Sequence, residues 1–335
     1  MAETPEARLR APTPAELPLV IGADILRKAK PADRATLLGP VLPRASLTLL
    51  YGTRGVGKTF LALSMALAVA SGGAILRWRA QKPARVLYVD GEMPRAMLVE
   101  RLAALAAGAE LLPAADNLRL LASEGDAGSR IDLATEDGRA RIAEACDGTD
   151  LLVLDSLSVL LRNRSIEAGR AWTDVEDWLL GLRRRGLAVL IVRNGNMRRD
   201  GSDSSRHADV VDTAIALRRP DDYEAFEGAR FDLRFTKGRA LLGTAAQPFE
   251  AALYRKDGLL RWFVSSREDA LVARAAGLFF EGFTVREVAS RLRISKSAAH
   301  RLGEQAIEQA ERNAEAAGTE LGHAEILKDL IGTDT

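Results

Sequence analysis

Residues 52–59 read GTRGVGKT, which is the pattern G-x-x-x-x-G-K-[ST] of a phosphate-binding loop. The loop lies between an expected strand over 46–51 and an expected helix over 58–70. Its glycines let the backbone curl so that successive N–H groups face a phosphate, and the helix N-terminus adds the positive end of its dipole. The sequence therefore predicts a nucleotide site, for which we expect ATP. The expected nucleotide-binding residues are Gly52, Thr53, Arg54, Gly55, Val56, Gly57, Lys58, Thr59 and Phe60.

Two other apolar runs end in carboxylates that suit nucleotide chemistry. LLVLD ends at Asp155, which we expect to hold a water of the Mg²⁺ shell, while the Thr59 hydroxyl ligates the ion and Lys58 reaches the β- and γ-phosphates. The alternative is that this acid only caps a turn. RVLYVDGE carries Asp90 as a structural acid and Glu92 as the favoured base for an attacking water. The alternative for Glu92 is a cap on the next helix.

Alternating strands and helices predict an α/β fold. The continuous apolar runs LTLLYG, RVLYVDGE, DLLVLDS and GLAVLIVRN are separated by helices expected over 58–70, 95–107 and 170–185. Runs of this kind are typical of parallel strands buried on both faces. Four later runs (TAIALRRP, RFDLRFTKG, FEAALYR and LLRWFVS) have hairpin-like spacing and predict antiparallel strands that extend the sheet. We therefore expect a mostly parallel twisted sheet flanked by helices.

Changes in composition divide the chain into five segments. Residues 1–18 are rich in Pro, Ala and Glu and are expected to form a disordered arm. Residues 19–45 are expected to be a short helical lead-in, and 46–266 the α/β domain. We expect a small all-α domain over 267–309, followed by a final helix and loose tail over 310–335.

The all-α segment contains a helix-turn-helix pattern. Thr284 followed by Glu287 makes a capping box, and apolar residues then share one helix face. Ser295 is the expected N-cap of a second helix, which would present its first turns to a major groove. The alternative is a helical hairpin that packs between subunits. The residues expected to contact duplex DNA are Lys296, Ser297, His300 and Arg301.

Residues 46–262 resemble the RecA-like core ATPases, within the AAA-family and KaiC-like group. They are most similar to the subfamily around RepA, the hexameric replicative helicase of broad-host-range plasmids. The motifs that carry the resemblance are GTRGVGKT, VLYVDGEMP, LLVLDSLSVLL, DVVDTAIALRRP and FTKGR. It implies a homo-oligomeric ring, expected to be a hexamer, with ATP at the subunit interfaces and movement on single-stranded DNA. It also implies that Lys237 and Arg239 reach into the neighbour's active site and neutralise γ-phosphate charge.

The sequence departs from the RecA-like pattern after the strand GLAVLIV. Relatives usually place His there, whereas this chain has Arg193 and Asn194. An Asn amide can still donate a hydrogen bond, so Asn194 is the candidate γ-phosphate sensor. The loop over 197–209 would line a central pore and bind DNA phosphates; the alternative is a solvated loop whose acids balance its bases. Its expected DNA-binding residues are Arg198, Arg199, Arg206 and His207.

Composition narrows the setting without naming a partner. The net charge is +1, so bulk charge does not indicate nucleic acid. The single cysteine, Cys146, and three scattered His exclude a Cys- or His-rich metal site and fit a reducing compartment. The N-terminus lacks the apolar core of a signal peptide, and no run approaches the ~20 apolar residues of a membrane span. We expect a cytoplasmic protein without a membrane partner.

Three functions remain open from the sequence. The leading one is an ATP-hydrolysing, ring-forming DNA motor of the replicative helicase type. The second is an ATP-dependent DNA-binding regulator or loader, in which the helix-turn-helix binds duplex DNA and slow hydrolysis acts as a switch. The third is a RecA-like signalling ATPase that binds no DNA. Fold-level analogy alone does not choose among them.

Overall fold

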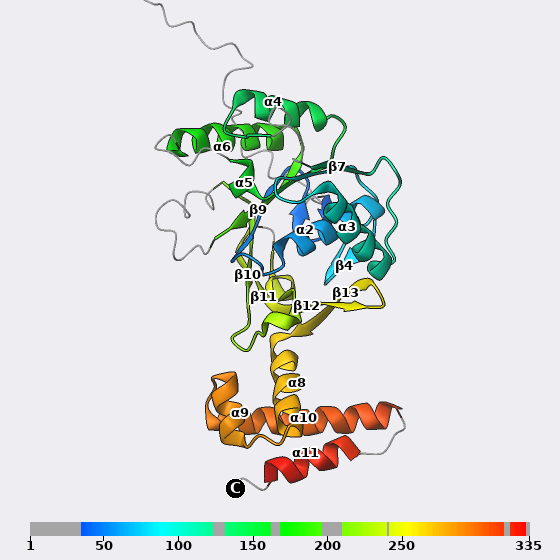
Figure 1. Ribbon diagram of the computed structural model, residues 1–335, viewed down its shortest axis with the longest axis vertical. Coiled ribbons are helices and arrows are strands. Elements are labelled where there is room, and N and C mark those ends of the chain that lie inside the picture. Colours follow the sequence, from blue (N-terminus) through cyan, green and yellow to red (C-terminus); the bar gives the residue numbers. More distant parts are fainter. Residues whose placement is uncertain are drawn as a thin grey trace, which may run out of the picture. The chain divides into compact units, whose positions relative to one another are not determined.

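The computed structural model of the chain describes residues 35–122, 131–161, 168–195, 210–239, 241–317 and 322–332 (Figure 1). Within these ranges nine strands form one sheet. In spatial order they are β13 (Leu259–Ser266), β12 (Phe249–Lys256), β11 (Arg230–Gly238), β10 (Thr213–Arg218), β3 (Leu47–Gly52), β9 (Ala188–Asn194), β8 (Leu151–Asp155), β6 (Val86–Asp90) and β7 (Leu118–Ala122). The strands from β10 to β7 are parallel, and β11, β12 and β13 are joined antiparallel. The predicted α/β fold with a mostly parallel sheet is confirmed.

Helices cover both faces of this sheet. On one face lie α2 (Lys58–Ser71) and α3 (Arg95–Ala109), and on the other lie α4 (Glu136–Ala145), α5 (Leu157–Leu160) and α6 (Ala168–Arg184) (Figure 1). Alternate residues of one strand enter separate cores, because successive side chains point to opposite faces. On β8, for example, Val153 packs with α2 while Leu152 and Leu154 pack with α6. This two-sided burial explains why the central strands are apolar throughout.

The parallel strands bring their carboxyl ends to one edge of the sheet. Gly52 of β3 pairs with Asn194 of β9, and Asp90 of β6 pairs with Asp155 of β8. Ligands of open α/β sheets bind outside these strand ends. The fold therefore gathers four of the expected site segments at one edge.

Several elements differ from the sequence predictions. Residues 35–45, expected within a helical lead-in, form the antiparallel pair β1 (Thr36–Leu38) and β2 (Leu42–Pro43), since Pro40 and Val41 make a turn and the flanking leucines are buried against α2. Strand β10 is parallel to β3, because it inserts beside a strand distant in sequence, and only its contact with β11 is antiparallel. The edge strand β7, α4 and the small hairpin of β4 (Ala74–Ile75) and β5 (Trp78–Arg79) were not predicted.

The C-terminal residues form four helices around a separate apolar cluster. They are α8 (Arg267–Phe280), α9 (Val285–Leu292), α10 (Lys296–Ala317) and α11 (Gly322–Gly332). The Thr284–Glu287 capping box is present, and a three-residue turn joins α9 to α10. The boundary expected at 309/310 falls inside α10, and α11 packs into the same cluster through Leu327 and Ile331. Within the described ranges, every helix is too short or too polar to cross a membrane.

Candidate nucleotide site

The phosphate-binding loop connects β3 to α2 with the backbone that its glycines allow. Gly57 has φ 110°, and a Cβ there would lie 2.8 Å from the Cβ of Ala229, so a side chain is excluded both by conformation and by space. Lys58 is buried at the start of α2, and its Nζ donates hydrogen bonds to the carbonyl oxygens of Gly52 (2.9 Å) and Thr53 (2.8 Å). Burial lowers the pKa of Lys58 to about 8. The ammonium group is therefore held against the phosphate-binding loop, where it is expected to contact the phosphates.

Asp155 ends β8 as a deeply buried carboxylate. Its Oδ2 accepts a 2.6 Å hydrogen bond from the Tyr88 hydroxyl, and the carboxylate is also hydrogen-bonded by the Thr59 hydroxyl. Burial raises the pKa of Asp155 to about 6, while these two donors act in the opposite direction. A buried acid beside the threonine of a phosphate-binding loop is an oxygen-ligand set that suits Mg²⁺.

Glu92 lies in the turn that follows β6 and is aimed by a neighbouring strand. Its Oε1 accepts a 2.7 Å hydrogen bond from the Ser156 hydroxyl, the residue after Asp155. Asp90 has a different task, because its Oδ1 accepts the backbone N–H groups of Glu92 (2.8 Å) and Met93 (2.5 Å) and so fixes this turn. Burial raises the pKa of Asp90. The geometry thus separates a structural acid from an exposed, oriented one.

These groups surround a cavity of about 540 Å³ over the phosphate-binding loop. Its lining residues are Arg54, Gly55, Gly57, Lys58, Thr59, Phe60, Glu92, Arg101, Asp155, Ser156, Asn194, Tyr223, Gly228 and Ala229. Sequence reasoning missed Arg101, Tyr223 and the Gly228–Ala229 pair as site residues. Their local sequence gives almost no sign of this role. One signal was available: Tyr223 is an aromatic residue in the polar segment RRPDDYE.

Lys237 and Arg239 lie away from this cavity. Lys237 pairs with Ala214 at the start of β10, whereas the phosphate-binding loop follows Gly52 at the other end of β3. Arg239 is half-exposed and forms a 3.1 Å ion pair with Asp212. Neither side chain lines the cavity of its own chain.

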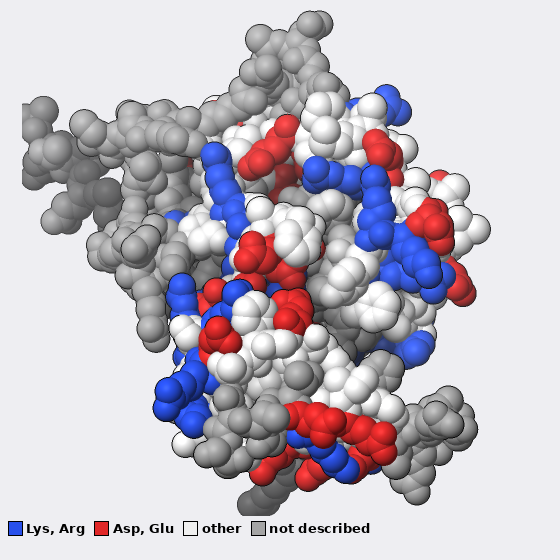
Figure 2. Space-filling view, turned by 60° about the horizontal axis from the view of Figure 1, so that its bottom comes forward, with Lys and Arg blue, Asp and Glu red and all other residues white. Residues whose placement is uncertain are grey.

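The expected DNA-binding residues fall into two groups. Arg198, Arg199, Arg206 and His207 lie outside the described residues. Lys296, Ser297, His300 and Arg301 occupy the first two turns of α10, with His300 half-buried and 3.7 Å from Glu304 and the other three exposed. Acidic and basic side chains are interspersed over the face shown in Figure 2. Neither sign of charge therefore dominates the described residues visible on this face.

The described residues provide no protein-only metal centre, because no three His, Cys, Asp or Glu side chains gather there to hold an ion. That agrees with Mg²⁺, which proteins usually bind through one or two oxygen ligands together with substrate phosphates. Thr59 and Asp155 supply such ligands beside the phosphate-binding loop, and the cavity has room for a nucleotide. The residues present fit a magnesium nucleotide.

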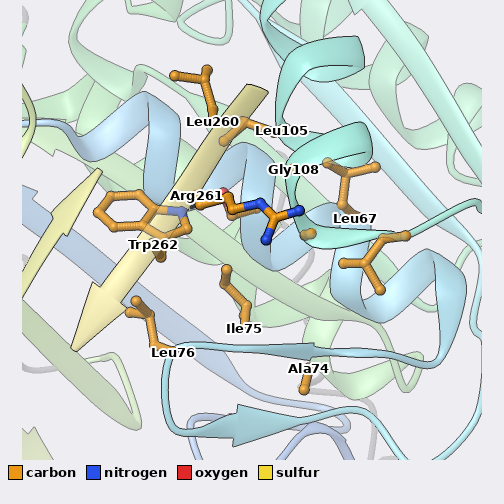
Figure 3. Close-up of a pocket in the computed structure, with 12 residues that line it drawn as sticks. Leu67, Ala74, Ile75, Leu76, Leu105, Gly108, Leu260, Arg261 and Trp262 are labelled. Atoms are coloured by element: carbon orange, nitrogen blue, oxygen red, sulfur yellow. Dashed lines mark hydrogen bonds between the residues drawn. The ribbon is translucent and has the colours of Figure 1, made fainter. Parts of the chain in front are cut away.

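A second, smaller cavity of about 240 Å³ lies between α2, α3, the β4–β5 hairpin and β13 (Figure 3). Its walls are mostly aliphatic, with Trp262 donating a 2.9 Å hydrogen bond from Nε1 to the Ser64 hydroxyl. It contains none of the phosphate-binding or acidic residues described above. Of these two cavities, only the larger one is therefore a candidate nucleotide site.

Comparison with known proteins found a matching family and similar solved structures. A KaiC-like protein from Pyrococcus horikoshii OT3 superposes with a TM-score of 0.48 at 12% identity, over 68% of this chain and 93% of that one. The flagellar accessory protein FlaH from Methanocaldococcus jannaschii gives 0.46 at 14% identity, over 73% and 97%. No curated protein matches the chain. A family model described as an AAA domain matches residues 11–196, just over half of the chain.

Proposed function

The chain belongs to the AAA domain family, and on that premise we propose that it is an ATP-hydrolysing, ring-forming DNA motor resembling the RepA-type replicative helicases. The observation that carries the proposal is the cavity over the phosphate-binding loop, in which Lys58, Asp155, Glu92 and Asn194 meet. A cation for the phosphates, an acid for the metal and an oriented base are the groups that phosphoryl transfer needs.

Each residue has a proposed task that follows from its position. Lys58 neutralises the β- and γ-phosphates, and Thr59 with Asp155 holds Mg²⁺, which when bound supplies charge neutralisation at the phosphate oxygens. Glu92, held by the Ser156 hydroxyl, orients the attacking water and accepts its proton. Asn194 ends β9 beside Gly52 and senses the γ-phosphate through its amide. The Glu92→Gln variant should bind ATP but hydrolyse it about 100-fold or more slowly.

Ring formation is supported by the position of Lys237 and Arg239, which lie away from the cavity of their own chain. In a ring these side chains would complete the site of the adjacent subunit and stabilise developing γ-phosphate charge. A mixing experiment tests this role. Arg239→Ala retains a phosphate-binding loop and Lys58→Ala retains the arginine, so mixed rings should hydrolyse ATP faster than either variant alone. No gain on mixing would contradict action between subunits.

DNA binding is the less supported half of the proposal. It depends on the 197–209 loop, by analogy with RecA-like proteins, and on the exposed residues at the start of α10. We would measure steady-state ATP hydrolysis alone, with single-stranded DNA and with duplex DNA, using Lys58→Ala as the blank. Stimulation by single strands would support the motor. Negligible turnover on every DNA, with ATP still bound, would contradict it.

The second candidate is an ATP-dependent regulator or loader that binds duplex DNA. The observation that favours it is the capped α9, joined to α10 by a three-residue turn, which is the turn length of a helix-turn-helix. Arg293, in the turn, and Lys296 and Arg301, on α10, are exposed and basic. Duplex binding that is lost in a Lys296→Ala/Arg301→Ala variant, without any strand separation by the parent protein, would favour this candidate.

A further inference from the structure

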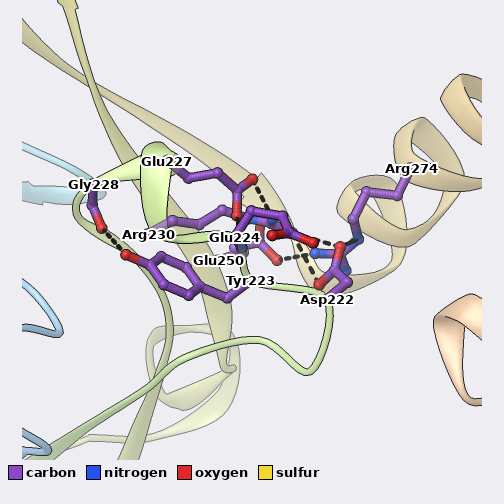
Figure 4. A network of polar contacts seen from close by, with 8 residues as sticks. All are labelled: Asp222, Tyr223, Glu224, Glu227, Gly228, Arg230, Glu250 and Arg274. Atoms are coloured by element: carbon purple, nitrogen blue, oxygen red, sulfur yellow. Dashed lines mark hydrogen bonds and ion pairs between the residues drawn. The ribbon is translucent and has the colours of Figure 1, made fainter.

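The loop between β10 and β11 touches the phosphate-binding loop directly. Arg219 donates a 3.1 Å hydrogen bond from Nη2 to the carbonyl oxygen of Gly55, and its guanidinium lies 4.1 Å from the ring centroid of Tyr223. The Tyr223 hydroxyl donates to the carbonyl oxygen of Gly228 (2.9 Å), which closes the loop on itself (Figure 4). Tyr223, Gly228 and Ala229 line the nucleotide cavity. A nucleotide that fills this cavity will therefore contact this loop.

The residues next to these cavity residues belong to a buried ionic network. Asp222 precedes Tyr223, and Arg230 follows Ala229 as the first residue of β11. Arg230 is only 7% exposed and reaches three carboxylates: Asp222 (3.0 Å), Glu227 (2.5 Å) and Glu250 on β12 (2.9 Å). The loop beside the proposed nucleotide site is thus fixed to the antiparallel end of the sheet through the buried guanidinium of Arg230.

Two of these three carboxylates also hold the first C-terminal helix. Arg274 on α8 places its Nε 3.0 Å from Asp222 Oδ2 and its Nη1 2.8 Å from Glu250 Oε2 (Figure 4). Asp222 and Glu250 are therefore each shared between Arg230 and Arg274. Arg274 therefore attaches α8 to the loop and to β12 through charge pairs.

We propose that this network couples the nucleotide site to the C-terminal helices: nucleotide binding at Tyr223 displaces Asp222 and loosens the hold of Asp222 and Glu250 on Arg274. The inference rests on the proposed nucleotide site. Asp222 lies 3.0 Å from Arg274 and directly precedes Tyr223, so a displacement of Tyr223 acts first on this contact. Separating the partners of a buried pair leaves charge uncompensated, which weakens the attachment of α8. The C-terminal helices then change their hold on the ATPase domain with nucleotide state.

By thermodynamic linkage, the Arg274 contact should in turn affect nucleotide affinity. If nucleotide loosens the Arg274 contact, removal of that contact has to favour nucleotide by the same factor. The Arg274→Ala variant should therefore bind a non-hydrolysable ATP analogue more tightly than the wild type, by about fivefold or more. A residue that only stabilised the fold would leave affinity unchanged or weaken it.

The experiment measures two quantities on the full chain. Amide hydrogen exchange over 267–280 should become several-fold faster when the wild type binds the ATP analogue with Mg²⁺, and this change should disappear in Arg274→Ala. Affinity for the analogue is titrated in parallel. Arg312→Ala on α10 is the matched arginine control, since Arg312 is 69% exposed and pairs only with Glu308 among the ion pairs found. Gly277→Ala controls for a change in α8 alone, because a Cβ there meets no atom within 4 Å.

Each outcome decides the inference. The coupling would be overturned if amide hydrogen exchange in α8 of the wild type were equally fast with and without nucleotide. It would also be overturned if Arg274→Ala bound nucleotide with unaltered affinity. Either result would leave the proposed ATPase intact. Wild-type protein that binds no ATP would overturn both. If Arg274→Ala does not fold, Arg274→Lys replaces it, because the ammonium group lacks the planar fork of donors that spans the two carboxylates.

Discussion

The Tyr88 hydroxyl donates a 2.6 Å hydrogen bond to Oδ2 of Asp155, across the adjacent strands β6 and β8. Both side chains are buried, Tyr88 completely. Burial alone disfavours the ionised carboxylate, and this hydrogen bond acts against that effect. The tyrosine therefore holds the proposed metal-binding acid in one orientation and in its charged form.

Replacing Tyr88 with Phe should weaken the affinity of the proposed site for Mg²⁺. The loss of the hydroxyl leaves Oδ2 of Asp155 without that donor, and partners of metal ligands of this kind commonly contribute about tenfold or more to metal affinity. We expect the half-saturating Mg²⁺ concentration for ATP hydrolysis to rise about tenfold. Tyr254→Phe, at a half-exposed position on β12, is the control. Equal Mg²⁺ curves for Tyr88→Phe and wild type would show that the hydrogen bond is only structural.

Lys58 predicts a pH dependence of nucleotide affinity. Its pKa is lowered to about 8 by burial without nucleotide, and the negative phosphates of a bound nucleotide would raise it. Binding then requires proton uptake above pH 8, so affinity should fall as pH rises from 8 to 10, with a limit of about tenfold per unit. Below pH 7 this group should contribute no slope. Fluorescent ATP titrations across this range measure the effect.

The control for that titration is Lys58→Arg, because a guanidinium stays charged over the whole range. Whatever affinity this variant keeps should lack the slope above pH 8. A wild-type affinity that is constant from pH 7 to 10 would mean that Lys58 is not in contact with the phosphates.

Replacing Ser156 with Ala should slow ATP turnover and leave ATP binding unchanged. The Ser156 hydroxyl donates to Glu92, which is otherwise exposed and free to change rotamer. Without this contact the proposed base spends less time in the productive orientation, and we expect kcat to fall about tenfold with unchanged ATP affinity. Ser156→Thr, which keeps a hydroxyl, should restore part of the rate. A fall in affinity equal to the fall in kcat would argue that Ser156 contacts nucleotide instead.

Cys146 should report on the opening of the core. Burial raises the pKa of this thiol to about 11, and the thiolate is the form that reacts. A thiol reagent at pH 8 should therefore modify the native protein about 100-fold more slowly than the unfolded chain. The native rate should increase about tenfold per pH unit towards pH 11. Fast modification of native protein at pH 8 would indicate that the cluster of α4 and α6 opens readily.

The sequence predicted the elements whose signal is local. The central strands are apolar on both faces and end in an acid, asparagine or glycine, so β3, β6, β8 and β9 were recognisable, as were the positions of the phosphate-binding loop, Glu92 and Asp155. Strand β7 was missed because LRLLA is half-exposed at the sheet edge and has neither a continuous buried run nor clear alternation. The local residue pattern was therefore sufficient to predict a strand where that strand is buried on both faces.

The parts that were missed depend on contacts between distant segments. The direction of β10 relative to β3 is decided by its insertion beside the first strand of the sheet, which hairpin spacing does not show. Tyr223 and Arg101 line the nucleotide cavity only because a late loop and α3 fold over the phosphate-binding loop. The boundary expected at 309/310 falls inside α10, because apolar residues of this helix continue to Ala310 in the cluster shared with α11.

Gly108 should tolerate no side chain, although it lies inside α3 where alanine is usually favoured. A Cβ at this position would lie 2.0 Å from the carbonyl oxygen of Leu260 on β13, a backbone atom that cannot turn aside. The helix would be pushed away from the wall of the smaller cavity that it shares with β13 (Figure 3). We expect Gly108→Ala to lower the free energy of unfolding by about 1–3 kcal/mol in urea titrations.

Gly181→Ala on α6 is the matched control, since a Cβ there meets no atom within 4 Å. Because alanine loses less backbone freedom than glycine on folding, this variant should gain about 0.5–1 kcal/mol. Opposite signs for the two substitutions would separate the close approach of α3 and β13 from helix propensity. A Gly108→Ala variant as stable as Gly181→Ala would mean that α3 moves away from β13 without cost, and that the smaller cavity is not a fixed part of the fold.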